Sequence, residues 1–163
     1  MITADYCRMM ARYNHWQNSQ LTQAMAQLST VQLLADRGVF FNSILGTLNH
    51  LLIVDALWLS RFLGQPSPQA PLDSILHSNQ QDFAAARTHM DGALQNWVDG
   101  VTQAWLDGTL SFTALADGVP RTVPTTAAVL HLFNHGTHHR GQATALLTGY
   151  GVDPGVTDLV RMD

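Results

Sequence analysis

The sequence predicts an all-α fold: a four-helix bundle with a small β-hairpin inserted before the last helix. Two patterns lead to this prediction. Four long segments carry apolar residues at helical spacing: residues 3–28, 43–62, 74–101 and 124–149. Residues 109–124 instead alternate between apolar and polar side chains, as a strand does. Because 163 residues can bury a sizeable core, we expect residues 1–163 to form a single helical-bundle domain.

The first two predicted helices are separated by a region that a glycine interrupts. Residues 3–28 repeat apolar or amphipathic side chains at helical spacing: Tyr6, Met9, Met10, Tyr13, Trp16, Leu21, Met25 and Leu28. Gly38 then breaks the pattern. The second helix is predicted from about Ser43 to Phe62, because Ser43 precedes a long apolar run and serine is a good N-cap.

A proline-rich loop separates the second and third helices. Residues 64–71 contain three prolines, and that density breaks any regular element. Asp73 is the predicted N-cap of a helix from Ser74 to about Val101. Its apolar side consists of Ile75, Phe83, Met90, Leu94, Trp97 and Val101.

The change of period at residues 109–124 predicts the hairpin. Leu110 and Phe112 alternate with polar neighbours. The run Ala116–Gly118 (Ala-Asp-Gly) then turns the chain, since Asp-Gly between alternating segments is a hairpin signal.

The last helix is predicted to start near Pro124 and Thr125. Proline is tolerated in a first helical turn, and threonine is a good cap. The helix ends by residues 149–151, where two glycines stand. The tail, residues 152–163, is predicted as a loop or a short strand.

Composition excludes several classes of protein. A net charge of −4, with only 12% charged residues, offers no basic patch for nucleic acid. The single cysteine, Cys7, excludes an internal disulfide framework and leaves a reducing cytoplasm as the expected location. The amino terminus lacks the basic-then-apolar pattern of a secretory signal. The most apolar stretch, residues 44–63, contains Asn49, His50, Asp55 and Arg61, so it predicts a buried helix and no membrane span.

The absence of two residue types narrows the chemistry further. The chain has neither lysine nor glutamate; its twelve acids are aspartates and its eight basic residues are arginines. A His-Glu-x-x-His metalloprotease motif and Schiff-base chemistry through lysine are therefore excluded.

Four of the eight histidines lie between His131 and His139 on the last predicted helix. His135 and His139 are four residues apart, so they lie about 40° apart around the helix axis and can bind one ion. The same phase places them on the apolar stripe of that helix, with Ala128, Leu132 and Ala143.

A third histidine completes a candidate metal site. His50 lies alone in the apolar second helix, and three imidazoles with one open position are typical of catalytic rather than structural sites. The alternative is that these are core histidines satisfied by other polar partners. The angular positions of His131 and His138 around the helix place them at the edge of the pocket or in the second coordination shell. His131 also remains a candidate metal ligand. The remaining histidines are expected on the surface: His15, His77 and His89.

Several runs resemble the DinB/YfiT-like metalloenzymes, which are unrelated to the DNA polymerase that shares the DinB name. These runs are His50 with Asp55 and Trp58, the run Asn-His-Gly-Thr-His-His-Arg-Gly-Gln at 134–142, the opening 13–18 and the tail 151–158. The match spans nearly the whole chain, and the histidine run is its most specific part.

The resemblance implies a four-helix bundle with a small β insertion, a homodimer, and one divalent metal ion per chain. Carried over residue by residue, the ligands are His50, His135 and His139. Imidazole suits zinc, nickel, copper and iron, and zinc or nickel is expected first. Similar proteins include thiol-dependent S-transferases and isomerases that use low-molecular-weight thiols, and some members are linked to stress responses.

Three functions stay open. The leading hypothesis is a metal-dependent transferase that attacks a small electrophile with a thiolate. The second is a metal-dependent hydrolase, whose base would be an aspartate, His131 or His138. The third is a non-catalytic metal or small-ligand binding protein. Arg140 could bind an acidic group of the thiol or the substrate, but its position around the helix axis turns it away from His135. Asp55 could form a second-shell hydrogen bond only to a metal ligand on another helix.

Overall fold

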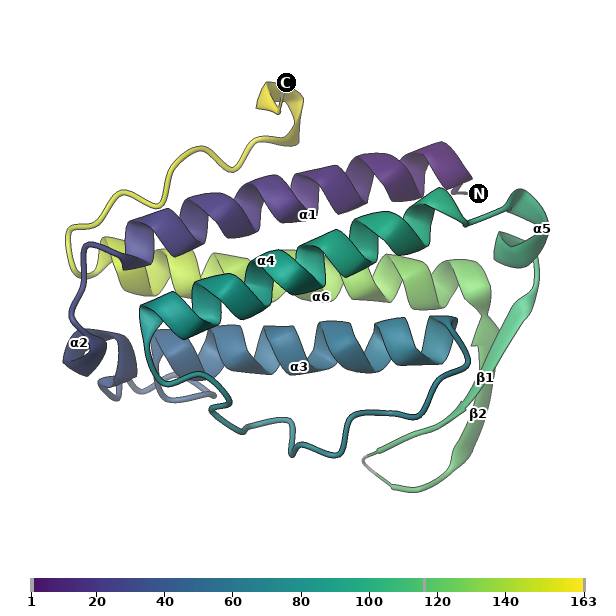
Figure 1. Ribbon diagram of the computed structural model, residues 1–163, viewed down its shortest axis with the longest axis horizontal. Coiled ribbons are helices and arrows are strands. Elements are labelled where there is room, and N and C mark those ends of the chain that lie inside the picture. Colours follow the sequence, from purple (N-terminus) through teal and green to yellow (C-terminus); the bar gives the residue numbers. More distant parts are fainter. Residues whose placement is uncertain (1, 116, 163) are drawn as a thin grey trace.

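Four long helices form a bundle in the computed structural model, which describes residues 2–115 and 117–162 (Figure 1). The elements in chain order are α1 (Ala4–Met25), α2 (Thr30–Leu34), α3 (Ile44–Phe62), α4 (Gln80–Asp99), α5 (Gln103–Leu106), β1 (Thr109–Thr113), β2 (Pro120–Pro124), α6 (Thr125–Thr148) and the 3₁₀ turn η1 (Leu159–Arg161). Helix α1 packs against α4 and α6, and α3 packs against the same two helices. The predicted fold class is confirmed.

Helix α3 is the most enclosed element of the bundle. Every one of its residues is buried except Ala56 and Arg61, which are partly exposed. It faces α4 and α6, residues 63–79 run alongside it, and β1 lies near its C-terminal end (Figure 1). Enclosure on these sides explains why most residues of α3 are apolar. None of the described helices is long and apolar enough to cross a membrane.

Two hydrophobic clusters stabilise the bundle, one towards each end. One contains Trp58, Phe62, Trp97, Val129 and Phe133 from three of the long helices, and the hairpin packs on it. The other gathers buried side chains of α1, α2, α3, α4 and α6: Leu21, Ala24, Met25, Leu33, Ile44, Leu45, Leu48, Leu52, Phe83, Ala143 and Leu147, with Val152 from the tail. The histidines of α3 and α6 lie along the helices between these clusters.

The start of α3 is as predicted, but the start of α4 is not. Ser43 caps α3 by accepting a hydrogen bond from the Gly46 N–H at 3.0 Å. Helix α4 begins six residues later than predicted, with Asn79 rather than Asp73 as its N-cap. Ile75, predicted on the apolar side of that helix, is 46% exposed in the preceding loop.

Long-range hydrogen bonds keep this preceding loop from being helical. The Asn49 side chain on α3 accepts a hydrogen bond from the His77 N–H at 2.9 Å. It also donates to the His77 carbonyl at 3.0 Å. His77 therefore lies half-buried in a loop rather than on the surface of a helix.

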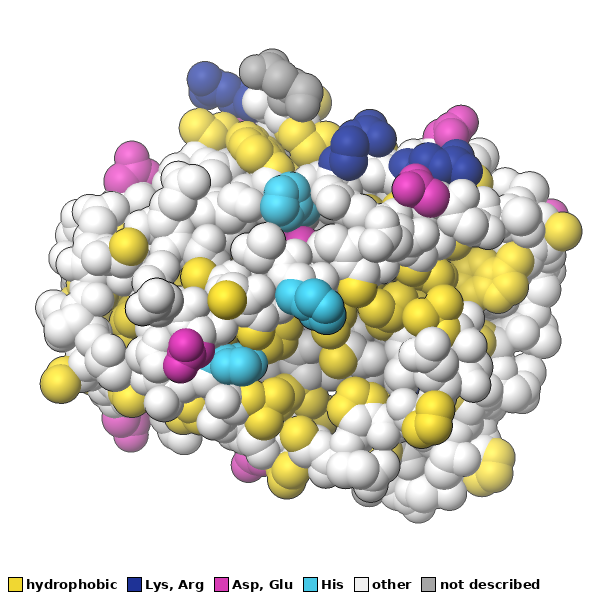
Figure 2. Space-filling view, in the orientation of Figure 1, with side chains coloured by type: hydrophobic (Ala, Val, Ile, Leu, Met, Phe, Trp, Pro, Cys, Tyr) yellow, Lys and Arg dark blue, Asp and Glu magenta, His cyan; other side chains and the backbone are white. Residues whose placement is uncertain are grey.

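An apolar groove lies between α3, α4 and this loop. Hydrophobic side chains gather in the strip between α4 and the loop on the face that Figure 2 shows. Ile53, Pro68 and Met90 line the groove, whose volume is about 280 Å³. His89 lies at its edge and is exposed, as predicted.

The hairpin and the last helix follow the prediction with two differences. Strands β1 and β2 pair antiparallel, with Leu110 opposite Val123. Gly118 has a φ of 69°, while Ala116, part of the predicted turn, lies outside the described residues. Thr125 is not the cap of α6, because Pro124 holds that position without a side-chain hydrogen bond. The Thr125 N–H instead donates to the Gly108 carbonyl at 3.1 Å.

The sequence did not predict two short helices, and it left the tail open as a loop or a short strand. Helices α2 and α5 are single short turns capped by Ser29 and Thr102. The tail forms no strand in its described part. It is held along α1 by the Tyr13 hydroxyl, which donates to the Thr157 carbonyl at 2.6 Å, and by the Gln17 amide, which donates to the Val156 carbonyl at 2.8 Å.

A buried layer of charged side chains connects all four long helices. Arg87 on α4 donates to Asp55 on α3 at 2.7 Å and pairs with Asp91 at 2.8 Å, and all three are at most 3% exposed. Asn14 on α1 donates to Asp91 at 3.2 Å and accepts a hydrogen bond from Arg140 on α6. The layer contains two aspartates and two arginines, so its formal charges balance.

Candidate metal centre

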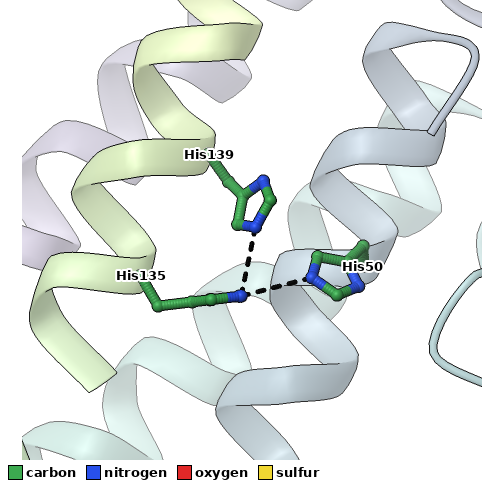
Figure 3. A group of neighbouring side chains, drawn as sticks. All are labelled: His50, His135 and His139. Carbon is green, nitrogen blue, oxygen red and sulfur yellow. Dashed lines mark hydrogen bonds between the residues drawn. The ribbon is translucent and has the colours of Figure 1, made fainter. Parts of the chain in front are cut away.

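His50, His135 and His139 converge between α3 and α6 (Figure 3). His135 and His139 project from consecutive turns of α6, and His50 projects towards them from α3. The Nε2 atom of His135 lies 3.2 Å from Nε2 of His50 and 3.1 Å from Nε2 of His139. The one ligand atom that each ring offers lies within 4.8 Å of the other two, so the group could hold a metal ion.

The outward nitrogens of two rings have clear hydrogen-bond partners. His50 Nδ1 lies 2.8 Å from the Leu72 carbonyl, and His139 Nδ1 lies 2.7 Å from Oε1 of Gln142. Both partners are acceptors in these positions, so each Nδ1 carries the proton of a neutral ring. The Nε2 atoms of His50 and His139 are therefore bare lone pairs directed at His135.

Neither neutral tautomer of His135 gives both of its ring nitrogens a suitable hydrogen-bond partner. Its Nδ1 is buried without a hydrogen-bond partner among the described atoms. With the proton on Nε2, Nδ1 is a buried acceptor without a donor; with the proton on Nδ1, three lone pairs face one another. Either state is costly in a protein interior. A cation bound by the three Nε2 atoms removes the repulsion among the lone pairs.

The spacing of the nitrogens also fits a metal ion. Zinc binds imidazole nitrogen at about 2.0–2.1 Å, which places two nitrogens of a tetrahedral site about 3.3 Å apart. The two nearest pairs here are 3.2 and 3.1 Å apart. The hydrogen bonds from Nδ1 to a carbonyl and to an amide oxygen are those that orient metal-binding histidines in proteins. The residues present therefore fit a divalent ion.

The protonation of the three rings suits metal binding. Burial, with the charges of His139 and His50 next in importance, lowers the pKa of His135 to about 3. Burial is also the main reason that the pKa values of His50 and His139 lie below the usual range. All three imidazoles are thus neutral at pH 7, the form that binds metals.

Phe41 is a neighbour of the site that the sequence did not reveal. Its ring stacks on His50 with centroids 3.9 Å apart and an angle of 19°, and it meets His139 edge-on at 5.6 Å. Gly46 permits this approach, because a Cβ on Gly46 would lie 2.0 Å from the Phe41 carbonyl oxygen. Two adjacent phenylalanines in the connection before α3 were the only signal; the other, Phe40, is 86% exposed.

The two flanking histidines lie at the edge of the group. His131 and His138 are both exposed. The His131 ring lies 5.5 Å from the His135 ring, and the His138 ring lies 4.8 Å from that of His139. His15, predicted as a surface residue without a partner, is instead half-buried, with Nδ1 at 3.6 Å from the Asp91 carboxylate.

Arg140 and Asp55 belong to the charged layer, away from the three histidines. Arg140 turns towards α1, as its helix phase predicted, and Gly136 leaves room for its guanidinium. The idea that Asp55 serves a histidine on another helix is wrong, because its carboxylate pairs with Arg87. Among the described residues, no carboxylate bonds His50, His135 or His139.

Comparison with known proteins agrees with this fold. The model of the DinB family matches residues 1–163. A solved structure, that of a DinB-like protein from Bacillus cereus ATCC 10987, has a TM-score of 0.66 and 19% sequence identity, over 86% of this chain and 91% of that protein. At this identity the likeness shows the fold alone. No curated protein sequence matches the chain.

Proposed function

Because this chain belongs to the DinB family, we propose that His50, His135 and His139 bind one divalent metal ion, and that the protein transfers a low-molecular-weight thiol to a small electrophile. One observation carries the proposal. Three Nε2 atoms converge, and no neutral tautomer of His135 satisfies both of its ring nitrogens and its two neighbours. Zinc and nickel are the first candidates, since imidazole suits both.

The surroundings favour thiol chemistry over hydrolysis. A divalent ion held by these three neutral imidazoles would keep its full charge and would lower the pKa of a thiol bound to it. A hydrolase would need a base close to its water; no described carboxylate contacts the three histidines, so this base could only be His131 or His138. In a transfer reaction the thiol loses its proton to solvent. Its sulfur then forms a bond to carbon while the leaving group departs with the electrons of the bond that breaks.

The chain's own residues orient and shield the site. The Leu72 carbonyl and the Gln142 amide fix two of the rings through their Nδ1 atoms. Phe41 covers one face of His50, and this keeps water from that side of the ring. The arrangement therefore supplies a preorganised, partly dry position for a nucleophile.

Elemental analysis of untagged protein purified without nickel resin tests the metal site. We expect about one divalent ion per chain, lost when His50, His135 or His139 is replaced by alanine. His131→Ala and His138→Ala serve as matched controls from the same helix and should keep the ion. Wild-type protein that binds no ion, even after reconstitution with zinc, nickel, manganese and iron, would contradict the proposal.

A panel of electrophiles and esters, assayed with and without added thiol, tests the reaction. We expect metal-dependent product formation that requires the thiol. Hydrolysis in its absence would instead support the hydrolase. Tight ligand binding without turnover would support a binding protein. The proposal includes a homodimer in the cytoplasm, and sedimentation of the metal-loaded protein tests the dimer.

A further inference from the structure

Arg61 is a partly enclosed cation without an acidic partner. It lies on α3, eleven residues after His50, which is about three helical turns and therefore the same face. Its guanidinium carbon lies 4.6 Å from the Trp58 ring centroid and 4.1 Å from that of Phe112. Its Nη2 donates to the Thr113 carbonyl at 3.3 Å, while its buried Nε has no hydrogen-bond partner among the described atoms.

A continuous row of rings connects Arg61 with the candidate metal centre. The His135 and His131 rings are 5.5 Å apart, and the His131 and Trp58 rings are 5.0 Å apart. The Arg61 guanidinium then stacks on Trp58. The row follows the contact between α3 and α6 towards the hairpin. One small molecule lying along it would touch the histidines at one end and Arg61 at the other.

The charge of Arg61 is less well compensated than that of three other arginines. Arg8, Arg87 and Arg121 each pair with an aspartate. No described carboxylate pairs with Arg61, and burial alone lowers its pKa. A partly exposed guanidinium that is held against two rings and bonds only a carbonyl matches a carboxylate in charge and geometry.

A cleft lies between the hairpin and the loop that follows α3, and none of the residues of the row lines it. The cleft has a volume of about 310 Å³ and is bounded by Pro71, Leu72 and Leu115. Leu72 provides the carbonyl that binds His50. Leu115 stands two residues after Thr113, the partner of Arg61. The cleft thus adjoins elements that contact both ends of the row.

We propose that Arg61 binds the carboxylate of a small substrate whose other end reaches His50, His135 and His139. Trp58 and His131 provide the aromatic surface for the middle of that molecule. The substrate class is accordingly an elongated acid whose carboxylate is separated from its metal-bound end by an uncharged, apolar middle, because eleven residues of helix rise by about 16 Å. This inference rests on the proposed metal site and names what that site would accept.

A series of thiol probes of graded length tests Arg61. The cobalt(II)-loaded protein is titrated with ω-mercaptoalkanoic acids and with mercaptoalkanols of equal chain length, and the thiolate-to-cobalt absorption band reports binding. We expect the acid to bind about tenfold more tightly than the alcohol at one intermediate length, since one charge-assisted pair is gained there. Arg61→Gln should abolish this preference and leave the affinity for the alcohols unchanged.

Arg37→Gln is the matched control, because Arg37 also stacks on a ring, that of Tyr150. It should keep the acid preference. Equal binding of acids and alcohols at every length, or a preference that survives Arg61→Gln, would overturn the role of Arg61. If Arg61→Gln fails to fold, Arg61→Lys takes its place, and we expect a preference reduced to about threefold because the planar fork is lost. A complete absence of the thiolate band would instead refute the metal–thiol site itself.

Discussion

The protonation of His135 makes the stability of the metal-free protein depend on pH. Its pKa in the folded state is about 3, below the value of 6.5 for an unperturbed ring. The unfolded chain therefore binds the proton more readily, and the folded state loses stability as the pH falls below 6.5. The slope is at most about 1.4 kcal/mol per pH unit for this ring, reduced by the solvent around a partly buried group.

Urea unfolding of metal-free protein between pH 7 and pH 5 measures this effect. We expect the free energy of unfolding to fall steadily over this range. His135→Gln should show a flatter dependence, because the replaced side chain does not titrate. An identical slope in the variant would mean that other groups, such as His50 and His139, account for the whole dependence.

The three candidate ligands could be predicted from the sequence, but their neighbours could not. His135 and His139 share a helix face by their spacing alone, and His50 stood out as a histidine in an apolar helix. Phe41 and Leu72 reach the site through folded connections between helices. Their positions depend on contacts far apart in the chain, for which helical periodicity gives no information.

At the level of the elements, Gly46 determines how the connection before α3 meets the helix. Gly46→Ala would place a Cβ at 2.0 Å from the Phe41 carbonyl, so the connection has to move. We expect a loss of about 1–3 kcal/mol in the free energy of unfolding. We also expect faster release of metal to a chelator, because Phe41 moves away from His50.

Gly92→Ala on α4 is the matched control for this substitution. It is also a glycine within a helix, but a Cβ there would meet nothing within 4 Å. We expect it to stabilise the protein by about 0.5–1 kcal/mol. Thermal unfolding of both variants measures the difference, and equal effects would contradict the close approach of Phe41 to α3.

At the starts of α4 and α6, the residues near the helix end were not sufficient to predict which residue is the N-cap. Asp73 and Asn79 are both good caps, and only the bonds between Asn49 and His77 decide between them. Thr125 resembles a cap, but its N–H is held by Gly108. The hairpin, in contrast, was predictable because its alternating pattern is local.

Across the whole molecule, the charged layer is the feature that fixes the four long helices relative to one another. Arg87→Met would leave Asp55 and Asp91 buried without their cation. We expect a loss of about 3–5 kcal/mol in the free energy of unfolding, measured in urea. Arg8→Met, which removes the exposed pair with Asp5, should cost less than about 1 kcal/mol. Similar losses in the two variants would contradict the importance of the buried layer.

The separation of His50 and His135 by 85 residues also bears on the order of assembly. An ion can join them only after α3 and α6 have come together, which requires closing a long loop. The apolar clusters and the charged layer bring these helices together with protein contacts alone. We therefore expect the chain to fold first and to take up its ion last and reversibly. The fraction of loaded molecules would then follow the supply of free metal around the protein.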